Sequence, residues 1–319
     1  MPHRVILDTD IGTDVDDCLA LAVLLGSPGV DLVGVTTVYG DVHLRARMID
    51  RLLRLAGRPD VPIRLGSSQT LMGVREIYWP GHEGVGLLDD TGRDWQPDPE
   101  HAVDFIVRTV MANPGQIHLL AVGPMTNIAL AIRREPRLLA SLAGFTLMAG
   151  AARVHDGLHL PYAEHNLTCD PEAAAIVFRQ PEDKVVVPLD VTTRVLIRRE
   201  DLPAIRAGGS AFHDAVATQV ALYPNVVRNG QTAAHDPLAA LAIVRPDLLG
   251  LTPVHIDIEV AGEHAGMSLM RTSSNDAPAN AHVALTVEAD AAEREIIARI
   301  ARPLQSPRSA SRTPDPVTG

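Results

Sequence analysis

Short apolar runs that suit β-strands alternate with longer helix-like segments through the first 190 residues of this chain of 319 residues. The alternation is typical of βαβ units, in which parallel strands form one sheet with helices on both faces. The expected strands of this part are His3–Leu7, Leu32–Val38, Pro62–Leu65, Ile117–Val122, Phe145–Met148 and Val185–Leu189. The expected helices are Asp17–Leu25, Val42–Ala56, Pro99–Ala112, Thr126–Arg134, Pro171–Arg179 and Leu202–Ala207. We therefore predict an α/β fold with an open, mostly parallel, Rossmann-like sheet.

The remaining third of the chain adds to this fold. Two further helices are expected at Phe212–Leu222 and Pro237–Val244, three extra strands at Val254–Val260, Met267–Arg271 and His282–Val287, and a closing helix near Ala291–Ile300. No Gly/Ser linker and no repeat divides the chain, so a single domain is expected over residues 1–304. Residues 305–319 are rich in Ser, Pro, Arg and Thr, and this tail is expected to be disordered.

Charge and composition exclude several classes of partner. The net charge of −11 argues against nucleic acid or an anionic membrane as a partner. No apolar run approaches the roughly 18 residues needed to span a bilayer, and the N-terminus lacks the apolar stretch of a signal peptide. We therefore expect a cytoplasmic protein. Its two cysteines, Cys18 and Cys169, suit small buried hydrophobic residues better than a disulfide framework.

Five aspartates follow the first expected strand within ten residues: Asp8, Asp10, Asp14, Asp16 and Asp17. Like charges this close repel one another, and removing them from water costs several kcal/mol each unless a cation compensates. A solvated acidic loop that caps the next helix would explain one such residue. Five of them between an apolar strand and an apolar helix instead indicate a site for a hard divalent cation with oxygen ligands.

The carboxyl ends of four expected strands carry small or polar residues, at 8–10, 36–41, 122–124 and 148–151. Ligands of open parallel sheets bind outside these strand ends. We therefore expect the four segments to converge on one crevice, which does not by itself name a reaction.

Two polar residues near position 165 add to the candidate site. Glu164 and Asn166 alternate as at the edge of a strand, which would present a carboxylate and an amide to one side. Sugar hydroxyls suit that pair. Asp170, by contrast, precedes Pro171 and is explained as the N-cap of a helix.

Two histidines lie in motifs that are weak when taken alone. His82 stands in the Gly-rich segment 81–86, which is either functional or an exposed turn. His235 and Asp236 precede Pro237, and Asp236 could be only a helix N-cap there.

Together these segments resemble the nucleoside hydrolase family, the Ca²⁺-dependent inosine/uridine-type N-ribohydrolases. The likeness covers roughly residues 3 to 290, in five motifs that follow the family's order and spacing: 8–21, 36–41, 122–129, 164–173 and 235–239. Each motif is modestly specific, and five in order are strongly so. The resemblance implies an enzyme that hydrolyses the N-glycosidic bond of ribonucleosides to ribose and free nucleobase. It also implies a homodimer or homotetramer.

The resemblance further implies roles for individual residues. Asp10, Asp17, Asp236 and the backbone carbonyl of Val122 would bind one Ca²⁺, and Asp10 would be the general base toward the Ca²⁺-bound water. Asp16 and Asn166 would bind the 2′- and 3′-hydroxyls of ribose and Glu164 the 5′-hydroxyl. His82 and His235 would lie near the leaving nucleobase. Asp41 and Met148, at two of the converging strand ends, complete the expected substrate-binding set.

The sequence departs from the family in ways that leave questions open. Two extra residues within Thr13–Val15 separate Gly12 from Asp16 relative to the commonest spacing, so Asp14 is a rival metal ligand. Asp41 stands where many members have Asn. The preferred nucleobase does not follow from these motifs.

Three other functions are compatible with parts of the sequence. A Mg²⁺-dependent phosphatase of the haloacid dehalogenase type also has Asp-x-Asp after its first strand, but needs a lysine, and Lys184 is the single one. An EF-hand loop needs Gly at position six and Glu at position twelve. Counting from Asp8 these are Thr13 and Leu19, and counting from Asp10 they are Val15 and Leu21, so the EF-hand is excluded. A non-hydrolytic ribonucleoside-binding member of the resembled family is the third alternative.

Overall fold

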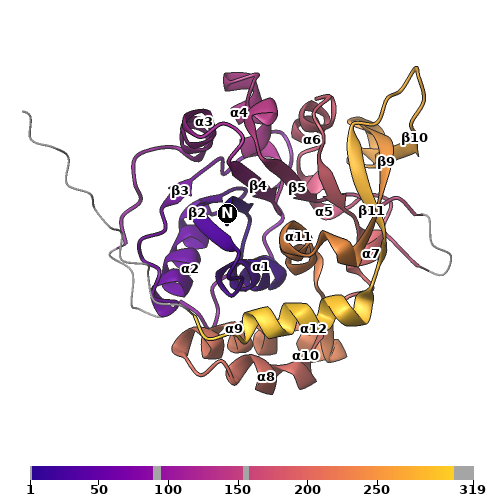
Figure 1. Ribbon diagram of the computed structural model, residues 1–319. Helices are drawn as coiled ribbons and strands as arrows, with labels where there is room; N and C mark the ends of the chain where they lie inside the picture. Colours follow the sequence, from indigo (N-terminus) through magenta and orange to yellow (C-terminus); the bar gives the residue numbers. More distant parts are fainter. Residues whose placement is uncertain (1, 89–94, 154–157, 305–319) are drawn as a thin grey trace, which may run out of the picture.

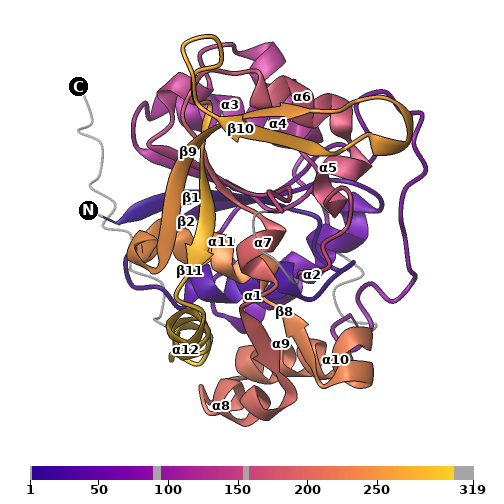
Figure 2. The same ribbon diagram turned by 90° about the vertical axis from the view of Figure 1, so that its right-hand side faces the viewer.

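The computed structural model describes residues 2–88, 95–153 and 158–304, so the tail expected to be disordered lies outside the described residues. Within this part, nine strands form one sheet in the order β10-β9-β11-β6-β5-β4-β1-β2-β3 (Figures 1 and 2). The strands are β1 (His3–Thr9), β2 (Val30–Thr37), β3 (Ile63–Leu65), β4 (Ile117–Ala121), β5 (Gly144–Met148), β6 (Val185–Val187), β9 (Leu249–Ile258), β10 (Ser268–Thr272) and β11 (Ala281–Val287). Only β9 runs against its neighbours, β10 and β11. The mostly parallel sheet with extra C-terminal strands is confirmed.

Helices cover both faces of the sheet (Figure 1). One face carries α1 (Asp16–Leu25), α2 (Val42–Leu55), α11 (His235–Val244) and α12 (Ala289–Ile300), and the other carries α3 (Ala102–Ala112), α4 (Thr126–Arg134) and α6 (Pro171–Phe178). Side chains of β1 alternate between the two layers, because Val5 belongs to one buried cluster and Ile6 to the other. A strand buried on both faces must be apolar throughout, which explains the uninterrupted run at this point of the sequence.

A small layer lies beneath α1 and consists of α8 (Leu202–Arg206), α9 (Ala211–Leu222) and α10 (Pro224–Asn229) (Figures 1 and 2). Next to it, β7 (Leu196–Arg198) and β8 (Gln231–Ala233) pair as an antiparallel two-stranded sheet. This sheet, α10 and two short helices, α5 (His165–Cys169) and α7 (Leu189–Thr192), were not expected from the sequence. The strand expected to reach Leu189 ends at Val187, since Pro188 has no N–H to continue the ladder.

The strand order places the expected crevice at the middle of the sheet. From β1 the chain first adds β2 and β3 on one side and then β4, β5 and β6 on the other. The winding therefore reverses between β1 and β4, and such a switch point is where open α/β sheets bind ligands. In the described part, no helix is both long and apolar enough to cross a membrane. Cys18 and Cys169 are free and buried, as expected.

Candidate active site

A cavity of about 740 Å³ lies at the carboxyl ends of β1, β4 and β5, within the size range of small-molecule sites. Asp10 reaches it from the end of β1, Val122 from the end of β4 and Met148 from the last position of β5. Eight more of the residues singled out from the sequence line it: Asp14, Asp16, Asp17, His82, Glu164, Asn166, His235 and Asp236. The structure thus brings together residues from six separate segments of the chain.

Asp41 does not line this cavity. It is exposed and is the N-cap of α2, where its carboxylate accepts a hydrogen bond from the backbone N–H of Leu44 at 2.9 Å. Capping of the helix accounts for an acidic residue at this position.

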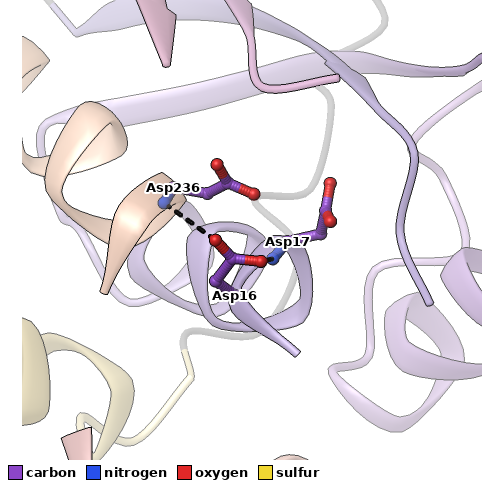
Figure 3. A group of neighbouring side chains, drawn as sticks. All are labelled: Asp16, Asp17 and Asp236. Carbon is purple, nitrogen blue, oxygen red and sulfur yellow. Dashed lines mark hydrogen bonds between the residues drawn. The ribbon is translucent and has the colours of Figure 1, made fainter. Parts of the chain in front are cut away.

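Three carboxylates form the tightest acidic group of the described chain. Asp16 and Asp17 begin α1, and Asp236 lies in the first turn of α11, the helix that packs against α1. Their carboxylate oxygens lie within 4.8 Å of one another, and all three residues are buried (Figure 3). Asp16 accepts hydrogen bonds from the backbone N–H groups of Asp17 at 3.1 Å and Asp236 at 3.4 Å. The acidic first turns of α1 and α11 therefore lie next to each other.

Burial sets the electrostatics of this group. It raises the pKa of Asp16, Asp17 and Asp236 well above the ordinary value, and the charges of the neighbouring aspartates raise each pKa further. A bound cation would remove this penalty, because an opposite charge favours the ionised form. The available donors are carboxylates and a backbone carbonyl, all of them oxygen, and they suit a hard cation such as Ca²⁺ or Mg²⁺.

Asp10 sits against the loop that follows β4. A Cβ atom at Gly123 would lie 2.8 Å from the Asp10 Oδ1 atom and 3.0 Å from its backbone nitrogen, so any larger residue would displace the carboxylate. Burial raises the pKa of Asp10, whereas the nearby Arg45 and His165 lower it. Gly123 therefore lets this carboxylate stand in the cavity beside the acidic group.

Arg45 is a buried cation that the sequence reading missed. Its Nη1 atom donates to the backbone carbonyls of Asp10 and of Ile11, the latter at 2.7 Å, and its Nε atom donates to the carbonyl of Tyr39 at 2.6 Å. The guanidinium also lies 4.9 Å from the ring centre of Trp79. Arg45 thus holds the acidic loop after β1 against the loop after β2. An arginine among the mostly apolar buried positions of α2 was the available signal.

Glu164 and Asn166 do not stand at a strand edge, so this prediction is wrong. Glu164 is the N-cap of α5, and Asn166 is the second residue of that helix. The Glu164 carboxylate accepts hydrogen bonds from the backbone N–H groups of Asn166 at 2.7 Å and Gly150 at 3.2 Å. A cap therefore explains this glutamate, as one does Asp170, although Glu164 also lines the cavity.

The Asn166 amide has a defined orientation. Its Nδ2 atom donates to the carbonyl oxygens of Val122 at 2.8 Å and Met148 at 3.1 Å. Both amide protons are thereby used, and the Oδ1 atom is left to accept a hydrogen bond from a ligand hydroxyl. The Val122 carbonyl keeps its second lone pair for a cation.

The two histidines are fixed by different partners. His82 Nε2 lies 3.0 Å from the carbonyl oxygen of Thr13, and since a carbonyl only accepts, this nitrogen carries the proton. His235 Nδ1 lies 2.7 Å from the hydroxyl of Thr192, and burial lowers the pKa of His235. Helix α11 begins at His235 with Ala234 as N-cap, so Asp236 is not a capping residue.

One wall of the cavity carries polar residues that the sequence reading did not single out. Tyr223, Asn225 and Arg228 line it from the junction of α9 and α10 and from α10 itself. Tyr223 donates a hydrogen bond from its hydroxyl to the Oδ2 atom of Asp14 at 2.6 Å. No motif marks this junction, because it lies between two ordinary helices.

Comparison with known proteins identifies the family. A model of the family described as inosine-uridine preferring nucleoside hydrolase matches residues 5–294. The chain is 30% identical to the inosine-uridine preferring nucleoside hydrolase of Crithidia fasciculata, with 91% of this chain and 94% of that protein aligned. It is 33% identical to the non-specific ribonucleoside hydrolase RihC of Salmonella paratyphi C, with 90% and 94% aligned. The structure of a purine-preferring ribonucleoside hydrolase from Gardnerella vaginalis superposes with a TM-score of 0.84 at 29% identity, covering 93% and 98% of the chains. The chain belongs to the inosine-uridine preferring nucleoside hydrolase family.

Proposed function

We propose that this protein hydrolyses the N-glycosidic bond of ribonucleosides and releases ribose and the free nucleobase. The observation that carries the proposal is the shared cavity, in which the acidic group, Asp10 and Asn166 face one another. Family membership supports the same reaction. The three relatives compared above are named for different nucleobase preferences, so we leave that preference open.

The cation that we propose for the site is Ca²⁺, bound by Asp10, Asp17, Asp236 and the carbonyl of Val122. Bound there, it would lower the pKa of a water molecule and hold that water on one face of the sugar. Asp16 is close enough to Asp17 and Asp236 to share the cation. Asp14 is left out of this ligand set; its carboxylate oxygens accept hydrogen bonds from the backbone N–H of Val15 and from Tyr223.

Asp10 is the general base in this proposal. The reaction passes through an oxocarbenium-like sugar, and the attacking water loses a proton as the bond to the nucleobase breaks. Asp10 lines the same cavity as the acidic group, so its carboxylate would be placed to take this proton. Asp16 and Asn166 bind the ribose 2′- and 3′-hydroxyls and Glu164 the 5′-hydroxyl, which holds the ring in a reactive orientation.

The structure argues against the phosphatase alternative, because the single lysine that it requires, Lys184, lies outside the cavity. Lys184 is buried at the start of β6, and its Nζ atom donates to the carbonyl oxygens of Gln180 at 3.0 Å, Glu182 at 2.7 Å and Asn280 at 2.7 Å. It is not among the residues that line the cavity. Lys184 therefore joins peripheral segments of the fold and does not serve the site.

The direct experiment is an assay of ribose release from inosine, adenosine, uridine and cytidine by the purified protein. Release from at least one of them supports the proposal. Binding of these nucleosides without release would instead show a non-hydrolytic binding protein. The homodimer or homotetramer expected from the family stays a prediction.

The ribose contacts predict discrimination against deoxyribonucleosides. If Asp16 and Asn166 bind the 2′- and 3′-hydroxyls, a 2′-deoxy substrate leaves a buried polar group unpaired at a cost of about 1–3 kcal/mol. We expect kcat/KM for 2′-deoxyinosine or 2′-deoxyuridine to be at least about tenfold lower than for the ribonucleoside. Equal rates for the two sugars would refute the assignment.

The two histidines are expected to differ in importance. His235 adjoins Asp236 and its Nδ1 atom lies 2.7 Å from the Thr192 hydroxyl, whereas His82 lies on a Gly-rich loop; both side chains are half-buried. We expect His235→Ala to reduce kcat more than His82→Ala, by an amount that depends on the nucleobase, and His82→Ala to act mainly on KM. Steady-state rates with inosine and uridine measure this. Equal losses with both substrates in both variants would show that neither histidine assists the leaving group.

A further inference from the structure

Thr13 and Asp14, in the loop after β1, accept hydrogen bonds from two ring-bearing side chains that line the cavity. The carbonyl of Thr13 accepts the hydrogen bond from His82, and the carboxylate of Asp14 accepts the one from Tyr223. The rings of His82 and Tyr223 are 6.2 Å apart, and both line the cavity together with Asp14. This segment belongs to the stretch with two residues more than the commonest family spacing. Within it, the Thr13 carbonyl and the Asp14 carboxylate contact two rings of the cavity lining.

The hydrogen bond to Asp14 determines whether the Tyr223 hydroxyl can donate to a ligand or only accept from it. A phenol has a single proton, and in Tyr223 that proton points at the Asp14 Oδ2 atom over 2.6 Å. The Nδ2 atom of Asn225 donates to the same phenol oxygen at 3.3 Å. Burial and the charge of Asp14 raise the pKa of Tyr223, so the phenol stays protonated. Its oxygen therefore has acceptor capacity, and no free proton, to offer a ligand.

Asp14 is hydrogen-bonded through both of its carboxylate oxygens. Its Oδ1 atom accepts from the backbone N–H of Val15 at 2.5 Å, and its Oδ2 atom accepts from Tyr223. It lies outside the group formed by Asp16, Asp17 and Asp236. The bond also connects the loop after β1 with the start of α10, which are 209 residues apart. A carboxylate with both oxygens engaged in this way acts through its partner.

We propose that Asp14 is a positioning residue for the nucleobase: it holds the Tyr223 hydroxyl so that the phenol oxygen accepts a hydrogen bond from an N–H group of the base. The inference rests on the proposed function, because it requires a nucleoside in the cavity. It assigns Asp14 to recognition of the base and removes it from the metal site. Tyr223 would then favour nucleobases that have a free N–H group on the edge facing the phenol oxygen.

The test is a double-mutant cycle on Asp14→Ala, Tyr223→Phe and the double variant, with kcat/KM measured for inosine and uridine. Each single substitution is expected to lower kcat/KM about tenfold, and the double variant also about tenfold, because both remove the same contact. Losses that multiply to about a hundredfold, or no loss in Asp14→Ala, would overturn the inference. Asp60→Ala, which removes a surface aspartate paired with Arg58, is the control and should change nothing.

Two further measurements separate positioning from metal binding and from general damage. Asp14→Asn keeps one oxygen that can accept the Tyr223 proton, although it loses the second acceptor, which faces the Val15 N–H. It should therefore retain clearly more kcat/KM than Asp14→Ala and bind Ca²⁺ as well as the wild type. A loss as large as in Asp14→Ala, or weakened Ca²⁺ binding, would instead make Asp14 a charge ligand. The preference for uridine over 3-methyluridine, and for inosine over 1-methylinosine, should shrink at least threefold in Tyr223→Phe and Asp14→Ala, whereas general damage would leave it unchanged.

The outcomes distinguish this inference from the proposed function. If the wild-type protein releases ribose from no nucleoside, the proposed function fails and the inference fails with it. If the wild-type protein is active but the cycle is additive, only the inference is overturned.

Discussion

Asp10→Asn should lower kcat by at least about 10²-fold, which is the low end for loss of a general base. The substitution keeps the size of the side chain beside Gly123 but removes its ability to take a proton. KM should change much less, because the ribose contacts assigned to Asp16 and Asn166 remain. Steady-state ribose release with the wild type and the variant measures both constants.

Asp60→Asn provides a matched control, since Asp60 is an exposed aspartate that does not line the cavity. It should leave both constants unchanged. If Asp10→Asn raised KM and left kcat intact, Asp10 would position the substrate and would not act on the water.

Asp17→Ala and Asp236→Ala should each lose tightly bound Ca²⁺ and, with it, activity. Both residues belong to the acidic group, and both carboxylates are needed to compensate the charge of a divalent ion bound there. Metal content after dialysis and calorimetric titration with Ca²⁺ measure binding, and ribose release measures activity. Full activity in a metal-free Asp17→Ala protein would refute the metal site.

Loss of activity through unfolding can be told apart from loss of metal. In the metal-free protein, burial and the charge of Asp10 disfavour an ionised Asp17. Removing that carboxylate relieves repulsion but also breaks the hydrogen bond from the Thr9 hydroxyl. We therefore expect the metal-free Asp17→Ala protein to melt close to the metal-free wild type. A melting temperature far below that of the wild type would mean that Asp17 chiefly maintains the fold.

The sequence predicted most of the sheet because its strands are buried on both faces. Such strands must be apolar throughout, and the run at Val5 and Ile6 shows this pattern plainly. Short elements left weaker signals. Helix α5 has five residues, and its cap, Glu164, was interpreted as part of a strand edge because the alternation of Glu164 and Asn166 suits both structures.

The sequence also predicted which residues share the site, but not their contacts. Strand ends of a parallel sheet converge by topology, so the cavity-lining set around Asp10 followed from the strand assignments. Arg45 and Tyr223 were missed because each acts through tertiary contacts. Asp41 was included because of its place in a motif, although its carboxylate caps α2.

The most direct test of the account is ribose release from the four common ribonucleosides by the purified protein, before and after removal of metal by a chelator. We predict hydrolysis of at least one nucleoside, loss of that activity with chelator, and its return when Ca²⁺ is added back in excess. Undiminished hydrolysis by protein shown to contain no metal would contradict the role of the acidic group. No hydrolysis of any of the four by the Ca²⁺-loaded protein would contradict the proposed function itself.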